Sequence, residues 1–559
     1  MYSNKKNIIQ LVGLMKAHDI SNIVVSPGSR NLPVVMSLAG DKFFTCHTVV
    51  DERSAGFFAI GIAQHTRKAV AICCTSGSAV LNYAPSVAEA FYQRVPLVVI
   101  TADRPQSWIG QMTGQTIPQP DVFGKLTKCA VNLPEVRTSD DEWYCNRLVN
   151  EALLEVYHHG SGPVHINIPL SEPLYEYTDT PLPLSRVIRR EPVRPNIPPG
   201  YALRFSRYKR RMIIVGQSMN MSAAAQLYRL IRNHDCVILS EHLANIPHER
   251  HICNFDAVLG GTKPKNLIGF APDLLITTGG HIVSKRIRQF LSENPPKEHW
   301  HVTPSGEVVD TYRCVTEVIE AEGSDFIRFL AELSPQYSIR PYSRLWAQRS
   351  ELLPEPSAEY SDLMAIGALV RNIPKYSNLQ LANSSAVRLA QLFRLGRRIS
   401  VFSNRGTSGI DGCLSTAMGQ ASVCKEPTFI IIGDLAFFYD MNTLWNRVAP
   451  NLRIMLSNNG GGGIFHTLDG IEMREEVDSH TIVRHTSDAK AWSESRGLVY
   501  LPVTDERELS EQMPMFTDES AGKPMLMEVF TSMERNAEIL RRYYDSLVEI
   551  GEDEICFDD

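Results

Sequence analysis

Two apolar segments in the C-terminal third of the chain end in side chains that can bind a divalent cation. Gly433-Asp434 follows residues 427–432, and Asn458-Asn459 follows residues 452–457. We expect both segments to be buried parallel strands joined by a short helix over residues 437–447, which brings Asp434 and Asn459 to one edge of a sheet. Carboxylate, amide and carbonyl oxygens suit Mg²⁺, which also takes phosphate oxygens and water. The spacing therefore predicts a diphosphate held through a metal ion.

The same positions also fit ordinary turn chemistry, because Asp at a strand end and Asn-Gly at the start of a loop are common turn residues. The neighbouring sequence favours the metal site. Residues 433–437 and 458–465 resemble the diphosphate- and metal-binding signature of thiamine-diphosphate enzymes, with Leu435 in place of the more frequent Gly.

Length and composition predict a large enzyme. The chain has 559 residues, 43% hydrophobic and 21% charged, so it can bury several cores and about three domains are expected. Its formal net charge is −6 and its Lys and Arg residues are scattered. This charge distribution gives no electrostatic case for binding nucleic acid.

Targeting and redox features predict a cytoplasmic protein. The N-terminal segment is amphipathic, so no secretory signal is expected, and no run of about 20 apolar residues predicts a membrane span. The 11 cysteines include no CxxC motif and are expected to be reduced thiols. A metal cluster at His248, His251 and Cys253 is less favoured, because a second Cys/His pair at zinc-site spacing is missing.

Two proline-rich stretches, at residues 181–200 and 335–356, divide the chain into predicted domains at residues 1–182, 200–340 and 357–559. Each domain alternates short β-branched apolar segments with helical ones. The predicted fold class is therefore α/β, with three doubly wound parallel-sheet domains. The predicted strands lie at residues 22–25, 48–50, 70–74 and 96–100, then at 212–215, 237–239, 274–277 and 300–302, and finally at 399–402, 427–432, 452–457 and 525–529.

Glu52 ends a predicted strand and begins a helix. Such a residue is most often a first-turn acid favoured by the helix dipole. A functional role is favoured here, because the motifs of one enzyme family recur in order along the chain. They are SPGSR at residues 26–30, DERSAGFF at 51–58, CTSGSA at 74–79, TADRP at 101–105, GPVHINIP at 162–169, SNRGTSGIDG at 403–412 and the metal signature.

These motifs resemble the 2-succinyl-5-enolpyruvyl-6-hydroxy-3-cyclohexene-1-carboxylate (SEPHCHC) synthase family, thiamine-diphosphate enzymes of menaquinone biosynthesis. The similarity is densest at residues 20–175 and 375–470. It implies the three-domain fold of thiamine-diphosphate enzymes. The first domain would bind the pyrimidine and carry the catalytic Glu, and the third would bind the diphosphate and metal.

The resemblance implies roles for individual residues. Glu52 would hydrogen-bond N1′ of the aminopyrimidine and favour its imino tautomer. Ile410 would separate the two cofactor rings, and Asp434, Asn459 and the Gly461 carbonyl would ligate Mg²⁺ or Mn²⁺. The full implied set for thiamine diphosphate is Glu52, Ser384, Ser408, Gly409, Ile410, Gly433, Asp434, Leu435, Asn459, Gly461 and Ile464.

The family's substrates, 2-oxoglutarate and isochorismate, are multiply anionic, so fixed cations are expected in the site. Arginine suits this task, because its guanidinium binds carboxylates bidentately and stays charged. The implied substrate-binding residues are Ser29, Arg30, Arg104, Gln115, Lys285, Asn383, Ser384, Arg388, Arg405, Ile464 and Phe465.

The implied reaction decarboxylates 2-oxoglutarate and adds the resulting succinyl-semialdehyde carbanion to isochorismate in a 1,4 sense. The implied assembly is a homodimer or a dimer of dimers. A 2-oxoacid decarboxylase or an acetohydroxyacid-synthase-like carboligase is an alternative, but small neutral acceptors need no such arginine set. A non-catalytic relative is a second alternative, although a scaffold has no need of Glu52, Asp434 and Asn459 together.

Overall fold

The computed structural model describes residues 1–550 except 192, 194–195, 218–223, 247–250, 336–340, 468–469 and 473. His248 of the less favoured metal cluster lies outside the described residues. The chain forms two compact units. Unit 1 contains Met1–Pro192, Asn404–Thr428 and Ala436–Leu452, and unit 2 contains Val193–Ser403, Phe429–Leu435 and Arg453–Asp559.

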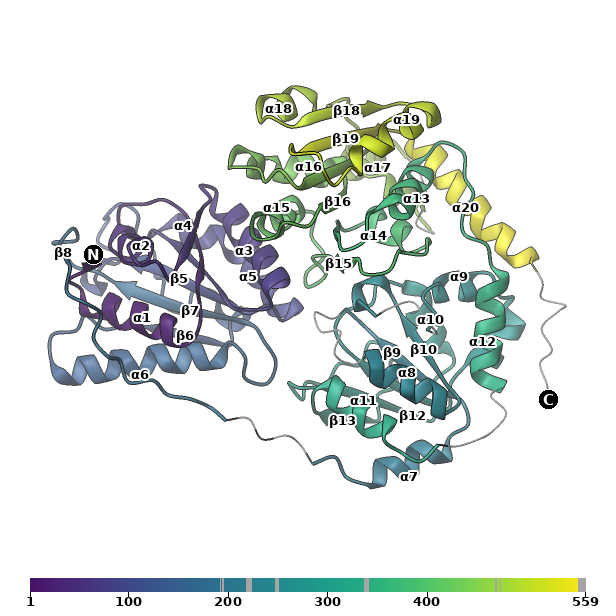
Figure 1. The fold of residues 1–559 in the computed structure, drawn as a ribbon, viewed down its shortest axis with the longest axis horizontal. Helices are drawn as coiled ribbons and strands as arrows, with labels where there is room; N and C mark the ends of the chain where they lie inside the picture. Colours follow the sequence, from purple (N-terminus) through teal and green to yellow (C-terminus); the bar gives the residue numbers. More distant parts are fainter. Residues whose placement is uncertain are drawn as a thin grey trace. The chain divides into compact units, whose positions relative to one another are not determined.

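The first sheet belongs to unit 1 and has six parallel strands in the order β3-β2-β4-β5-β7-β6. Strands β5, β6 and β7 are labelled in Figure 1. The strands are β2 Asn22–Val25, β3 Thr45–Thr48, β4 Val70–Cys74, β5 Leu97–Asp103, β6 Cys129–Asn132 and β7 Pro163–Pro169. Helices α1 (Lys6–Ala17), α2 (Leu32–Ala39) and α6 (Ser139–Glu155) share one core with this sheet. Helices α3 (Glu52–Thr66) and α5 (Ala84–Gln93) also pack on it.

The second sheet, in unit 2, has five parallel strands in the order β10-β9-β11-β12-β13. They are β9 Arg211–Val215, β10 Cys236–Ser240, β11 Leu274–Thr278, β12 Glu298–Thr303 and β13 Glu317–Glu320. Helices α9 (Phe255–Gly260), α10 (Lys285–Glu293) and α12 (Pro341–Leu352) cover one face. Helices α7 (Gly200–Arg207), α8 (Ala224–Asn233) and α11 (Gly323–Ala331) cover the other, so both faces are buried.

The third sheet has the strand order β15-β14-β16-β17-β19-β18. Its strands are β14 Asn378–Leu381, β15 Ser400–Phe402, β16 Thr428–Gly433, β17 Leu452–Asn458, β18 Val499–Val503 and β19 Met525–Phe530. The helices of this part of the chain are α13 (Asp362–Asn372), α14 (Ser385–Ala390), α16 (Asp434–Asp440), α19 (Glu506–Phe516) and α20 (Met533–Glu549). Helix α15 (Cys413–Val423) belongs to unit 1, where it packs against α3. The predicted α/β class with three doubly wound sheets is confirmed.

Two predicted elements are displaced. The strand expected at residues 48–50 is β3 and ends at Thr48, and the helix expected from residue 437 begins at Asp434. The carboxylate of Asp434 accepts a hydrogen bond from the Leu435 N–H at 2.7 Å, so the acidic side chain stabilises the first turn of α16. The metal-ligand candidate therefore begins the helix.

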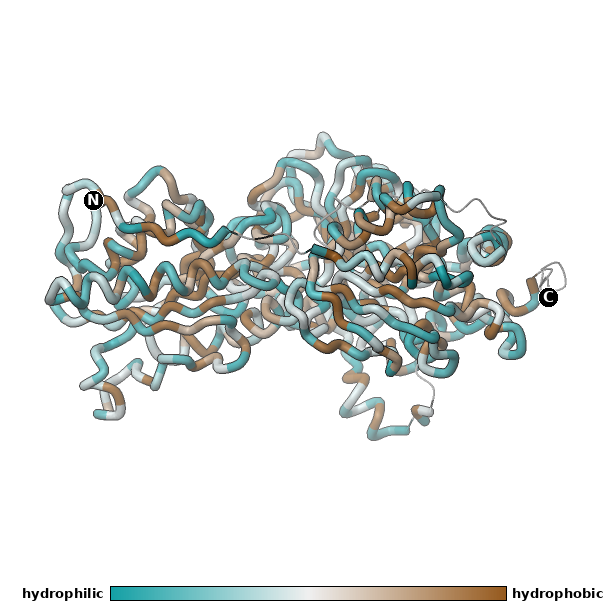
Figure 2. Tube along the Cα trace, turned by 90° about the horizontal axis from the view of Figure 1, so that it is seen from below, coloured by the Kyte–Doolittle hydropathy of each residue, from teal (hydrophilic) through white to brown (hydrophobic). Residues whose placement is uncertain are grey.

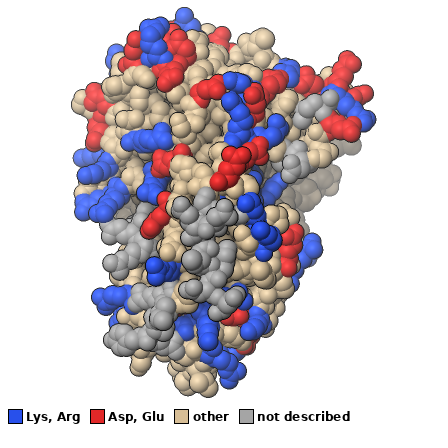
Figure 3. All heavy atoms as spheres, turned by 90° about the vertical axis from the view of Figure 1, so that its right-hand side faces the viewer, with Lys and Arg blue, Asp and Glu red and all other residues tan. Residues whose placement is uncertain are grey.

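Burial explains why the sequences of the strands are continuous apolar runs. Every residue of β4, β5, β7 and β17 is buried. Figure 2 shows brown, hydrophobic segments alternating with teal, hydrophilic ones along the chain. Acidic and basic side chains are interspersed on the face drawn in Figure 3. Within the described part of the chain, no helix is both long and apolar enough to cross a membrane.

Candidate active site

Asp434 lies at the C-terminal edge of the third sheet, where β16 meets α16. One of its carboxylate oxygens accepts hydrogen bonds from three consecutive backbone N–H groups, those of Asn459, Gly460 and Gly461, at 3.1, 2.8 and 3.0 Å. Asp434 is only 2% exposed. The ends of β16 and β17 are thus joined through this carboxylate, which confirms the expectation that Asp434 and Asn459 share one sheet edge.

The amide of Asn459 is held in one orientation. Its Nδ2 donates to Asp362 Oδ2 at 3.0 Å, and Asp362 Oδ1 accepts from Thr531 Oγ1 at 2.7 Å. The Oδ1 of Asn459 is buried and has no hydrogen-bond partner among the described residues. A buried amide oxygen without a donor is costly unless a ligand uses it, and a metal ion would do so.

The glycine run after β17 allows the loop to turn back onto Asp434. Gly461 has φ +151°, and a Cβ at this position would lie 2.8 Å from the Ile482 carbonyl oxygen. A side chain here is therefore excluded by both backbone conformation and space. Among the described residues, the Gly461 carbonyl accepts a hydrogen bond from the Gly463 N–H at 2.9 Å, and a carbonyl oxygen has a second lone pair that can bind a cation.

The electrostatics of this edge also suit a cation. Burial raises the pKa of Asp434, and the backbone donors and the nearby His485 act in the opposite direction. His485 Nε2 lies 3.4 Å from Asp434 Oδ2. A bound divalent cation would further favour the ionised carboxylate.

Unit 2 contains further predicted ligands. Ser384 has φ +73° and precedes α14, and its carbonyl accepts from Arg388 Nη1 at 2.6 Å. Asn383 is buried, Lys285 is exposed at the start of α10, and Gly433, Leu435, Ile464 and Phe465 are partly exposed. Glu241, which sequence patterns did not indicate, accepts from the N–H groups of Val283 and Ser284 just before Lys285.

Glu52 is the first residue of α3 in unit 1. The helix is capped by Asp51, whose Oδ1 accepts from the Arg53 and Ser54 N–H groups. Burial raises the pKa of Glu52, and the negative charge of Asp51 adds to the effect. A partly buried carboxyl with a raised pKa is suited to exchange a proton with a bound ligand.

Glycines let α3 pack closely against α15. A Cβ on Gly61 would lie 1.9 Å from the Thr416 carbonyl oxygen, and a Cβ on Gly419 would lie 1.9 Å from the Phe58 carbonyl oxygen. Each helix thus presents a glycine to the other's backbone. This packing sets the position of the helix that begins with Glu52.

The loop before α15 is anchored by Glu89 of α5. Its buried carboxylate accepts from the N–H groups of Gly406 and Thr407, both at 2.7 Å, and from the Thr407 hydroxyl at 2.8 Å. Burial raises the pKa of Glu89, and these donors oppose the effect. The loop presents four of the predicted residues, namely Arg405, partly exposed, Ser408 with φ +60°, Gly409, and Ile410, which is 42% exposed.

Two predicted arginines lie at the C-terminal edge of the first sheet. Arg30 is buried, donates to the Leu170 carbonyl at 3.0 Å and lies 3.3 Å from Glu172. Burial lowers the pKa of Arg30, and the positive charge of Arg104 lowers it further, so the two cations are close. Paired cations favour an anionic ligand. Ser29 and Gln115 are exposed in the loops beside them.

Comparison with known proteins identifies the family. Residues 9–123 match the thiamine pyrophosphate enzyme N-terminal TPP binding domain, and residues 181–375 match the middle domain of thiamine pyrophosphate enzymes. The SEPHCHC synthase of Bacteroides thetaiotaomicron is 50% identical over 557 residues, covering 98% of this chain and 100% of its own. The chain belongs to the SEPHCHC synthase family. The family member from Flavobacterium psychrophilum is 37% identical over 549 residues, covering 96% of this chain and 98% of its own.

A solved structure supports the fold of this SEPHCHC synthase family member. Benzoylformate decarboxylase from Polynucleobacter necessarius matches with a TM-score of 0.72 at 16% identity, covering 96% of this chain and 99% of the other. The predicted cofactor class is confirmed by the family: the chain is a thiamine-diphosphate-dependent enzyme, and such enzymes use Mg²⁺ or Mn²⁺. Asp434, the partnerless Asn459 oxygen and the Gly461 carbonyl form a donor set that fits either ion.

Sequence patterns did not indicate four acidic residues that hold neighbouring predicted residues or helices in place within their own units. Asp362 orients Asn459, Glu89 anchors the loop before α15, Glu241 holds the turn before Lys285, and Asp440 accepts from both the N–H and the hydroxyl of Ser415. All four are buried. A buried acid far in sequence from its donors leaves no local pattern, so only the folded chain identifies these residues.

Proposed function

We propose that the protein converts 2-oxoglutarate and isochorismate into SEPHCHC and carbon dioxide, a step of menaquinone biosynthesis. The observation that carries this proposal is 50% identity over nearly the whole chain to a SEPHCHC synthase. The donor set at the third sheet and the pair of cations at the first sheet support it. The donor set would bind the metal ion that holds a diphosphate, and the pair of cations would favour multiply anionic substrates.

Each half of the chemistry has residues suited to it. Thiamine diphosphate, when bound, supplies the electron sink that makes decarboxylation of a 2-oxo acid possible. Asp434, Asn459 and the Gly461 carbonyl would hold its metal ion, with Asp362 keeping the Asn459 oxygen directed to the ion. Glu52 would exchange a proton with N1′ of the pyrimidine, a task that its raised pKa favours.

The negative charge of the two substrates would explain the basic residues of the predicted site. Both 2-oxoglutarate and isochorismate carry two carboxylates, and a guanidinium binds a carboxylate through two parallel hydrogen bonds. Arg30 and Arg104 would bind carboxylates of one substrate, and Lys285, Arg388 and Arg405 would bind the other carboxylates. Arg104 already uses its Nε to donate to the Gly114 carbonyl at 3.3 Å, which fixes the side chain while leaving other donors for a ligand.

Carbon dioxide release tests the reaction. The protein is supplied with thiamine diphosphate, Mg²⁺ and 2-oxoglutarate, with and without isochorismate, and both carbon dioxide and SEPHCHC are measured. We expect isochorismate to accelerate carbon dioxide release and to yield SEPHCHC in equal amount. If the rate of carbon dioxide release does not change with isochorismate and the product is free succinic semialdehyde, the protein is instead a 2-oxoacid decarboxylase.

The active assembly would be a homodimer or a dimer of dimers, in which the first domain of one subunit and the third domain of its partner share each cofactor. Mixing two inactive variants tests this arrangement. Glu52→Gln and Asp434→Ala subunits are unfolded and refolded together in equal amounts. A mixed dimer would then contain one site with both lesions and one intact site.

The expected recovery follows from random pairing. About half of the dimers would be mixed, each with one intact site of two, so activity should return to roughly a quarter of the wild-type value. Differently tagged subunits confirm that mixed dimers form. If Glu52 and Asp434 of the same chain served one site, every site would keep one lesion and mixing would restore nothing.

A further inference from the structure

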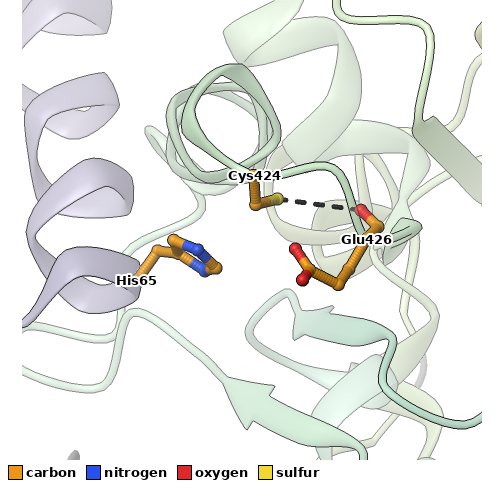
Figure 4. A group of neighbouring side chains, drawn as sticks. All are labelled: His65, Cys424 and Glu426. Atoms are coloured by element: carbon orange, nitrogen blue, oxygen red, sulfur yellow. Dashed lines mark hydrogen bonds between the residues drawn. The ribbon is translucent and has the colours of Figure 1, made fainter.

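A histidine, a cysteine and a glutamate meet at the C-terminal ends of α3 and α15, within unit 1. His65 is the penultimate residue of α3, Cys424 directly follows α15, and Glu426 lies two residues further along the chain. One ligand atom from each of the three lies within 4.8 Å of the others (Figure 4). No other such group of three occurs among the described residues.

We propose that His65, Cys424 and Glu426 form a Zn²⁺ site that ties the ends of α3 and α15 together. Zn²⁺ accepts a thiolate sulfur, an imidazole nitrogen and a carboxylate oxygen together, whereas Mg²⁺ prefers oxygen ligands alone. The thiolate and the carboxylate together neutralise a divalent ion. A water molecule would complete the tetrahedron.

The required movement is small. Zn–S and Zn–N bonds are about 2.3 and 2.0–2.1 Å long, so tetrahedral ligand atoms lie roughly 3.3–3.6 Å apart. The three side chains must therefore approach one another by about 1 Å. Glu426 is exposed and His65 and Cys424 are half-buried, so the glutamate can adjust without disturbing the core.

Asn451 holds the cysteine end of the site in place. Its Nδ2 donates to the Cys424 carbonyl at 3.1 Å and to the Glu426 carbonyl at 2.9 Å, and lies 3.6 Å from Cys424 Sγ. Thr428 Oγ1 lies 3.4 Å from the same sulfur. These contacts fix the turn that carries two of the three ligands and supply donors that stabilise a thiolate, as the outer contacts of metal sites do.

The position suggests a structural role. Gly61 of α3 contacts Thr416 of α15, and His65 lies near Cys424 and Glu426, which follow α15. The first residue of α3 is Glu52. An ion at the C-terminal ends would restrain the helix that begins with this glutamate, on top of the glycine packing already described.

Cobalt titration tests the site. Co²⁺ replaces Zn²⁺ in such sites and shows a thiolate charge-transfer absorption when bound to sulfur. The protein, saturated with thiamine diphosphate and Mg²⁺, is titrated with Co²⁺ and the absorption is then displaced with Zn²⁺. The candidate Mg²⁺ ligands Asp434, Asn459 and Gly461, here called the Asp434 edge, include no thiolate, so cobalt bound there gives no such band. We expect one equivalent of Co²⁺ to produce the band.

Three variants decide the outcome. Cys424→Ser should abolish the band, and Cys46→Ser, which removes another half-buried thiol of unit 1, should retain it. Glu426→Gln, at an exposed position, should retain the band with an affinity lower by about 10–100-fold. The proposal is overturned if the wild-type protein shows no band, if Cys424→Ser keeps it, or if Glu426→Gln binds as tightly as wild type.

Discussion

The Asp434 edge and the α3–α15 helix pair prepare acidic groups for chemistry in different ways. At the edge, Asp434 receives three N–H groups from one short loop that follows the neighbouring strand. In the helix pair, Glu52 begins a helix whose position depends on Gly61 and Gly419, two residues far apart in the chain. The edge is organised by hydrogen bonds, and the helix pair by close backbone packing.

This difference separates binding from reactivity. A metal site needs donors at fixed positions, and backbone groups at strand ends provide them at little entropic cost. A proton-exchanging acid needs a pKa set by its surroundings, which burial provides at Glu52. Lesions at the edge should therefore weaken cofactor binding, while lesions in the helix pair should spare binding and alter rate or stability.

The largest effect is expected for Glu52→Gln. The amide keeps the shape but cannot exchange a proton, so turnover should fall by about 10²–10⁴-fold while thiamine diphosphate still binds. Carbon dioxide release and proton exchange at the cofactor C2, followed by NMR, measure the loss. Glu506→Gln is the matched control, because Glu506 also begins a helix but is exposed. Normal exchange in Glu52→Gln would remove this residue from the chemistry.

Asp434→Ala should act on binding first. The ion loses its carboxylate ligand, so the affinity for Mg²⁺ and thiamine diphosphate should fall by at least about 100-fold. Calorimetric titration with both ligands provides the measurement. Asp518→Ala, at an exposed aspartate of unit 2, should bind as wild type does. An Asp434→Ala protein that binds normally would show that the edge is only a structural turn.

Asp362→Ala tests whether the edge depends on side-chain orientation. Without the acceptor for Asn459 Nδ2, the amide can rotate, and Mg²⁺ affinity should fall by about 10–100-fold. Thr531→Ala is the matched control, because it removes the hydrogen bond to the other Asp362 oxygen and leaves Asn459 held. Equal losses of affinity in the two variants would mean that general destabilisation, not orientation, explains the effect.

Asp440→Asn should give the smallest effect, on stability alone. Burial raises the pKa of Asp440 to about 7, although Ser415 of α15 and the charge of Arg53 of α3 oppose the shift. Between about pH 4 and pH 7 the folded state keeps a proton that the unfolded state has lost, so this group lowers the free energy of unfolding as pH rises. The slope is at most about 1.4 kcal/mol per pH unit.

Urea unfolding at about pH 5 and about pH 7 measures this slope. Asp440→Asn cannot ionise, so its unfolding midpoint should depend less on pH than that of the wild-type protein. Metal affinity should be unchanged, because the contacts of Asp440 are with Ser415 of α15 and Arg53 of α3 and lie in unit 1. A variant with the wild-type pH dependence would place the titration on another group.

Strand patterns predicted most of the sheets but little of their surroundings. The segments at residues 22–25 and 70–74 match β2 and β4, because a buried parallel strand must be a continuous apolar run. The helix after β16 begins three residues earlier than expected, at Asp434, since its carboxylate stabilises the first turn. Strand β7 was not predicted as a strand, although its seven residues are all buried.

The sequence alone determined the α/β class, the family motifs and the meeting of Asp434 with Asn459, because each depends on periodicity or on residues next to a strand end. Only the tertiary structure decided the orientation of Asn459 by Asp362, the anchoring of the 404–412 loop by Glu89, and the meeting of His65 with Cys424. These contacts join residues more than 90 positions apart. Chain folding brings such residues together, and no local pattern of residue types records the pairing.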